Sequence, residues 1–116
     1  MLDWVLQGFY NHIFDGGITK QEFGQRVHAD VKNRCRSFVP LNGVSVDCEP
    51  FFNQNGPVRG NPKGSLGVDV LIRHHGRPVI AFEIKTGKGM SESGFNKRRK
   101  WIGTSVIQIT LKPMKK

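Results

Sequence analysis

Two apolar runs joined by a glycine constrain the fold of this chain more than any other feature. Residues 68–73 and 78–85 are rich in β-branched side chains, and Gly76 lies between them. Runs of this length and composition, bounded by turn residues, are typical of strands, and the short connection predicts a β-hairpin. Both runs carry apolar residues on both faces, so we expect the hairpin to lie at the centre of a sheet.

The remaining sequence supplies helices and further strands around this hairpin. Apolar residues recur at helical spacing over residues 2–13 and 19–36, and a third helix is predicted over residues 91–102. Polar and apolar residues alternate over residues 44–49 and 105–111, which is the pattern of a half-buried strand. The sequence therefore predicts an α/β (α+β) chain with the element order α-α-β-β-β-α-β.

These elements fit a single domain over residues 1–116, which is an ordinary domain size. We expect a core over about residues 19–111, with a central mixed sheet of about four strands flanked by helices. Residues 2–13 then form an extra N-terminal helix. Residues 53–65 hold five Gly or Pro residues and are predicted to form a flexible surface loop.

Several classes of protein are excluded by what the sequence lacks. It has no apolar run of membrane-spanning length, no recognisable signal peptide and no internal repeat, so we expect a soluble domain without a membrane partner. Its two cysteines, Cys35 and Cys48, lack the C-x-x-C spacing of a zinc site. One disulfide is an alternative, but we expect two buried free thiols.

The predicted hairpin carries two carboxylates that we expect to face each other. If the hairpin is centred on Gly76, facing positions have numbers that add to 152, as 69 and 83 do. Asp69 and Glu83 would then have Cβ atoms about 4.5–5.5 Å apart. Lys85 lies two residues after Glu83, and residues i and i+2 of a strand point to the same face.

This arrangement points to metal chemistry, because two facing carboxylates repel each other unless a cation lies between them. Oxygen ligands from two carboxylates, with water and a phosphate oxygen, suit Mg²⁺ or Mn²⁺. Such a cation activates water and neutralises charge on a phosphoryl group, and Lys85 would stabilise the transition state. Glu-x-Lys alone is also common as a solvated charge pair, but the facing Asp69 favours catalysis.

The charge of the chain indicates a polyanionic partner. Lys and Arg number 18 against nine Asp and Glu, which gives a net charge of +9. Residues 59–116 hold 13 of these basic residues and three acids, so this half has a net charge of +10. The run 97–100 is either a solvated helix surface or a phosphate-binding surface. The candidate nucleic-acid contacts are Arg59, Lys63, Lys88, Lys97, Arg98, Arg99 and Lys100.

The order α-β-β-β-α-β, with Asp69 on one central strand and Glu83-Ile84-Lys85 on the next, resembles the PD-(D/E)XK nuclease superfamily. The resemblance implies that Asp69 and Glu83 bind the divalent cation and that Lys85 assists the attacking water. It also implies a metal-binding Glu on the first core helix, which Glu22 matches. Glu22 equally fits a capping box with Thr19, three residues earlier. The usual Pro before the Asp is absent, since Val68 occupies that position.

The resemblance implies a metal-dependent endonuclease, with DNA slightly favoured and tRNA or other RNA as the alternative substrate. The small size and basic charge also resemble the C-terminal nuclease toxin domains of bacterial contact-dependent inhibition and polymorphic toxin systems. That would imply action in the cytoplasm of a target cell and an acidic immunity protein as partner. Residues 83–89 are similar to VRR-type nucleases of phages or repair systems, which are a second expectation. A non-catalytic, basic nucleic-acid-binding module is a third.

Overall fold

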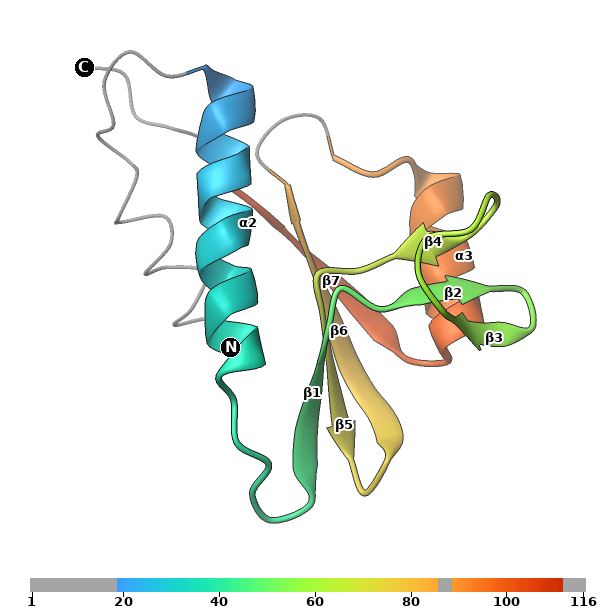
Figure 1. Ribbon diagram of the computed structural model, residues 1–116. Coiled ribbons are helices and arrows are strands. Elements are labelled where there is room, and N and C mark those ends of the chain that lie inside the picture. Colours follow the sequence, from blue (N-terminus) through green and yellow to red (C-terminus); the bar gives the residue numbers. More distant parts are fainter. Residues whose placement is uncertain (1–18, 86–88, 112–116) are drawn as a thin grey trace.

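The structure, a computed structural model, describes residues 19–85 and 89–111 and has three layers (Figure 1). A four-stranded sheet forms the middle layer, with one helix on one face and a second helix and a small sheet on the other. The expected helix over residues 2–13 lies outside the described residues. The four strands of the central sheet are β1 (Val44–Cys48), β5 (Val70–His74), β6 (Arg77–Lys85) and β7 (Ser105–Thr110).

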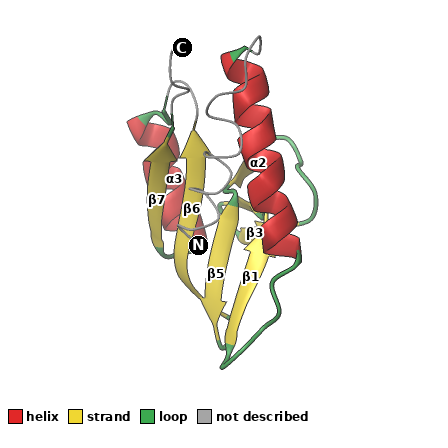
Figure 2. Ribbon diagram, turned by 90° about the vertical axis from the view of Figure 1, so that its left-hand side faces the viewer, coloured by secondary structure: helices red, strands yellow, loops and turns green. Residues whose placement is uncertain are grey.

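The central sheet is mixed, and its strand order is β1-β5-β6-β7 (Figure 2). β5 pairs antiparallel with both β1 and β6, whereas β6 and β7 are parallel. The predicted hairpin is therefore confirmed at the centre of the sheet. Its turn lies at His75 and Gly76, which both have positive φ, 50° and 80°. Gly76 adopts this conformation without the steric cost of a side chain.

Two helices pack on opposite faces of the sheet. α2 (Lys20–Arg36) begins at the predicted N-cap Thr19, and its capping box with Glu22 is present. α3 (Glu92–Ile102) has Ser91 as its N-cap and ends at a left-handed Gly103. The connection from β6 through α3 to the parallel β7 follows from these directions, because parallel neighbours need a crossover.

Each face of the sheet has its own apolar core. The α2 face buries the predicted helical stripe against side chains of β5 and β6: Phe23, Val27, Val31, Cys35, Val70 and Ile84. The α3 face buries a second set, formed by Phe52, Val68, Leu71, Ala81, Ile102 and Val106. Successive residues of β5 and β6 thus point into different cores, which explains why both strands are apolar on both faces.

The predicted loop over residues 53–65 is only partly a loop. Three short strands form a second sheet of order β3-β2-β4, and α3 packs beside them (Figure 1). They are β2 (Phe51–Asn53), β3 (Gly56–Val58) and β4 (Leu66–Gly67). Phe52 is 2% exposed and packs in the core on the α3 face. Gly56 and Pro57 lie within β3, whereas Gly60, Pro62 and Gly64 lie in the connection from β3 to β4.

The two cysteines form a disulfide, so the expectation of free thiols is wrong. Cys35 lies in the last turn of α2, and Cys48 ends β1. Their Cα atoms are 5.9 Å apart, within the range that a disulfide spans. The sequence does not indicate this contact, because the two cysteines are 13 residues apart and only the packing of α2 on β1 brings their side chains together.

None of the helices among residues 19–85 and 89–111 combines the length and the apolar character that crossing a membrane requires.

Candidate active site

Asp69, directly before β5, and Glu83, near the end of β6, have interacting carboxyl groups. Val70 pairs with Phe82 and Leu71 with Ala81, so facing numbers add to 152 as the sequence predicted. Asp69 lies in a bend directly before β5, and its N–H donates to the carbonyl of Phe82 at 3.0 Å, one residue out of the register of the ladder. An irregularity between Ile72 and Arg73 shifts the register only towards the turn.

Asp69 is held by hydrogen bonds from two different elements. Its Oδ1 lies 2.9 Å from Nδ1 of His28 on α2, and its Oδ2 accepts the backbone N–H of Ile84 at 2.6 Å. Burial tends to raise the pKa of Asp69, but the hydrogen bond and charge of His28 and the Ile84 N–H outweigh it, so the pKa is lowered. Asp69 therefore remains a carboxylate at neutral pH.

Glu83 is 6% exposed, the only charged residue in the described chain that is buried. Burial raises its pKa to about 8, and the neighbouring charge of Asp69 adds to this effect. Two cations lie near its carboxylate without forming hydrogen bonds. Lys85 Nζ is 3.9 Å from Oε1, and Arg98 Nε is 3.9 Å from Oε2. These two charges lower the pKa only partly.

A cavity of about 310 Å³ borders the two carboxylates. The small sheet, the ends of β1 and β5, and α3 all contribute to its wall. Its lining residues are Glu49, Phe51, Gly67, Val68, Asp69, Glu83 and Arg98. Glu49 is a third carboxylate in this wall, although its Oε2 is paired with Lys32 Nζ at 3.0 Å. The cavity thus combines acidic groups with a partly buried guanidinium.

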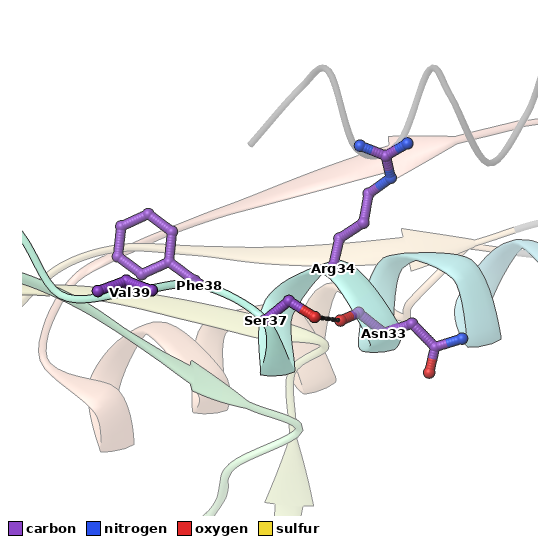
Figure 3. A pocket seen from close by; sticks show the side chains of 5 residues that line it. All are labelled: Asn33, Arg34, Ser37, Phe38 and Val39. Carbon is purple, nitrogen blue, oxygen red and sulfur yellow. Dashed lines mark hydrogen bonds between the residues drawn. The ribbon is translucent and has the colours of Figure 1, made fainter.

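A larger hollow of about 580 Å³ lies at the other end of α2 from its N-cap (Figure 3). It is lined by Asn33, Arg34, Ser37, Phe38 and Val39, and Ser37 Oγ donates to the Asn33 carbonyl at 2.9 Å. None of its lining residues is a carboxylate, histidine or cysteine, so it offers no acid–base or metal-binding chemistry. We therefore take the smaller cavity as the candidate active site.

Glu22 is not brought together with the acidic pair. It is exposed at the start of α2, where its Oε1 lies 3.3 Å from Thr19 Oγ1 in the capping box. His28, further along α2, is the helical residue that contacts Asp69. Within residues 19–85 and 89–111, no group of three or more His, Cys, Asp or Glu side chains is placed to hold a metal ion.

The two carboxylates nevertheless fit a hydrated divalent cation. Mg²⁺ and similar ions keep several waters and bind through one or two carboxylates together with phosphate oxygens. Each oxygen of Asp69 accepts one hydrogen bond and retains a second lone pair. Asp69 and Glu83 are thus the residues that would hold the ion.

The predicted basic residues separate into two groups. Arg98 is half-buried in the cavity wall, whereas the other described members are exposed: Arg59, Lys63, Lys97, Arg99 and Lys100. Lys88 lies outside the described residues. Exposed cations of this kind are suited to phosphate contacts on a polyanion.

Sequence reasoning missed the contact of His28 and the inward position of Arg98. His28 follows Val27, a member of the buried stripe of α2, which puts it at the border of the helix face that packs on the sheet. That position was a readable signal. Arg98 had no comparable signal, because four consecutive basic residues look alike until the packing of α3 is known.

No family model, curated protein or solved structure matches the chain.

Proposed function

We propose that this protein is a metal-dependent endonuclease that hydrolyses phosphodiester bonds in nucleic acid. The observation that carries the proposal is the adjacent pair of buried Glu83 and half-buried Asp69, with Lys85 on the same strand face and Arg98 in the same cavity. Placing two carboxyl groups side by side in a partly buried site is unfavourable, because one of them must keep a proton, so a function that needs them together is the simplest explanation.

The chemistry follows from what each side chain can do in the cavity. Asp69 and Glu83 would hold Mg²⁺ or Mn²⁺, which supplies Lewis-acid stabilisation of a phosphoryl group and a lowered pKa for water. Lys85 Nζ, 3.9 Å from Glu83, is suited to orient the attacking water and to stabilise developing negative charge. His28 keeps Asp69 ionised and in a fixed orientation.

A polynucleotide is the substrate class that the charge favours. The net charge of +9 and the exposed cations of α3 attract a polyanion, while the acidic pair accounts for hydrolysis. A PD-(D/E)XK nuclease is the family hypothesis that accommodates this arrangement, with DNA as the first substrate and tRNA as the second. Action as a bacterial toxin in a target cytoplasm, opposed by an acidic immunity protein, is the biological setting that we propose with it.

The proposal is tested by incubating the protein with supercoiled plasmid, single-stranded DNA and total tRNA in Mg²⁺ or Mn²⁺. We expect cleavage of at least one substrate and its loss in EDTA. Asp69→Asn and Glu83→Gln keep the size of each side chain and should lower the cleavage rate about 100-fold or more, because they remove the charges that hold the cation. Glu92→Gln, an exposed position at the start of α3, is the matched control and should cleave like the wild type.

Persistence of cleavage in EDTA or in both carboxylate variants would contradict the proposal. A wild-type protein that binds nucleic acid without cutting it would instead favour a non-catalytic, basic binding module. Calorimetry separates the two cases, since such a module has no reason to bind Mn²⁺ at Asp69 and Glu83.

A further inference from the structure

Arg98 differs from the basic residues on either side of it. Lys97, Arg99 and Lys100 are exposed on α3, whereas the side chain of Arg98 is only 15% exposed and lines the cavity. The side chains of four consecutive helical residues point in different directions around the helix axis, so the side chain of one of them faces the protein interior. The cationic run therefore presents one guanidinium to the acidic pair and three charges to solvent.

The guanidinium of Arg98 is fixed by two backbone carbonyls. Its Nε donates to the carbonyl of Gly67 on β4 at 2.8 Å, and its Nη1 donates to the carbonyl of Gly94 at 3.1 Å. A Cβ at Gly94 would lie 3.1 Å from Nη1, so a side chain there would crowd the group. Arg98 is thus positioned before any ligand binds, which reduces the entropy lost on binding.

These bonds leave part of the guanidinium without an acceptor. Arginine has five N–H donors, and the two carbonyls use one on Nε and one on Nη1. The nearest acidic atom, Glu83 Oε2, is 3.9 Å from Nε, which is too far for a hydrogen bond. Within residues 19–85 and 89–111, three N–H groups therefore have no hydrogen-bond partner, in a cavity that also holds the acidic pair.

We propose that Arg98 is a catalytic residue that binds the reacting phosphate through its free N–H groups, opposite Lys85 across Glu83. The inference rests on the proposed nuclease function and assigns Arg98 a role distinct from that of the exposed cations. A planar guanidinium contacts two phosphate oxygens at once, which a single ammonium does not. Placed beside the carboxylates, it stabilises the charge that develops on the phosphoryl oxygens in the transition state.

The test compares Arg98→Met with Arg77→Met, which removes an exposed arginine at the far end of β6 from Glu83. The substrate is the labelled plasmid fragment or tRNA that the wild type cleaves. Single-turnover rates are measured at saturating protein with Mg²⁺, and Kd is measured by fluorescence anisotropy with Ca²⁺. We expect Arg98→Met to lower the saturated rate about 100-fold with a Kd change below about threefold, and Arg77→Met to change neither.

A variant that loses affinity but keeps its saturated rate would overturn the inference, because Arg98 would then be an ordinary backbone contact. Thermal unfolding identifies a loss of rate that comes from loss of structure. In that case Arg98→Lys provides the test, since it keeps the charge and stem but not the two-pronged contact. A folded Arg98→Lys with the full saturated rate would also overturn the inference. A wild type that does not cleave refutes the proposed function, whereas a cleaving wild type matched by Arg98→Met refutes only this role.

Discussion

The pKa values of Asp69 and Glu83 shift in opposite directions although the two side chains are neighbours. Burial acts on both, but Asp69 receives hydrogen bonds from His28 and Ile84, and its pKa falls. For Glu83, burial and then the charge and hydrogen bond of Asp69 raise the pKa to about 8, and the more distant charges of Lys85 and Arg98 oppose this only in part. Without a metal, the pair therefore carries one negative charge at neutral pH, and Glu83 carries the proton.

This arrangement predicts that the metal-free protein loses stability as the pH rises from about 5 to about 8. Glu83 has a higher pKa in the folded protein than its ordinary 4.5, so folding takes up a proton across this interval. The hydrogen bond to Asp69 raises the pKa of His28 above 6.5, and its contribution is lost over the upper part of the interval. We expect the free energy of unfolding in EDTA to fall by on the order of 2 kcal/mol, measured by thermal or urea unfolding.

Two comparisons check the cause of this loss. Glu83→Gln removes one titrating group and should reduce the fall to the part that His28 contributes, and Mn²⁺ should reduce the fall by binding the ionised form. The lowered pKa of Asp69 contributes to the stability of the folded protein at higher pH. This contribution is lost only as the pH falls below 3.8, the ordinary pKa of an Asp side chain. A metal-free wild type with constant stability from pH 5 to pH 8 would contradict the assignment.

At the level of secondary structure, the sequence predicted the two described helices and the four strands of the central sheet. The capping box at Thr19 and Glu22, the N-cap Ser91 and the central hairpin all form as predicted. Each of these depends on residues that are close in sequence or related by a simple turn. The small sheet was missed because its strands have two or three residues, too few for a periodic pattern.

The candidate site was predicted only in part, for a related reason. Hairpin arithmetic placed Asp69 near Glu83, but the pairs beside the turn add to 151, and only the irregularity between Ile72 and Arg73 gives the expected sum of 152 further along. The contact of His28 with Asp69 and the inward position of Arg98 depend on how α2 and α3 pack against the sheet. For Arg98 this packing leaves no mark in the local sequence, whereas the place of His28 beside the buried stripe of α2 was a signal.

We expect the disulfide that joins α2 to β1 to stabilise the folded protein. Cys35 and Cys48 close a short segment that contains the whole connection between these elements. Cross-linking a loop of this length stabilises a fold by about 3 kcal/mol, mainly by restricting the unfolded chain. We expect Cys35→Ser with Cys48→Ser to lower the Tm by more than about 5 °C. Reduction of the wild type by dithiothreitol should lower it similarly, and should leave the double variant unchanged.

For the molecule as a whole, the excess of positive charge predicts strong salt dependence of nucleic-acid binding. Each phosphate contact releases condensed counterions, so log Kd rises with log salt concentration by about 0.9 per contact on duplex DNA. We expect replacement of Lys97, Arg99 and Lys100 by Gln to reduce this slope by about 2 to 3, measured by anisotropy over a NaCl series. Replacing exposed Arg34 and Arg36, which lie on α2, by Gln should leave the slope unchanged. An equal reduction in both variants would indicate a diffuse field rather than a binding surface on α3.

The exposed turn at His75 and Gly76 divides the two carboxylates in the chain, although the sheet joins them in space. Everything that α2 and Asp69 contribute comes before this turn, and Glu83, Lys85 and Arg98 come after it. Two fragments separated at this point would each carry half of the acidic pair, and neither could complete the cavity alone. Their reassociation through the β5–β6 ladder would rebuild it. The cavity is therefore complete only when the β5–β6 pairing brings the two parts of the chain together.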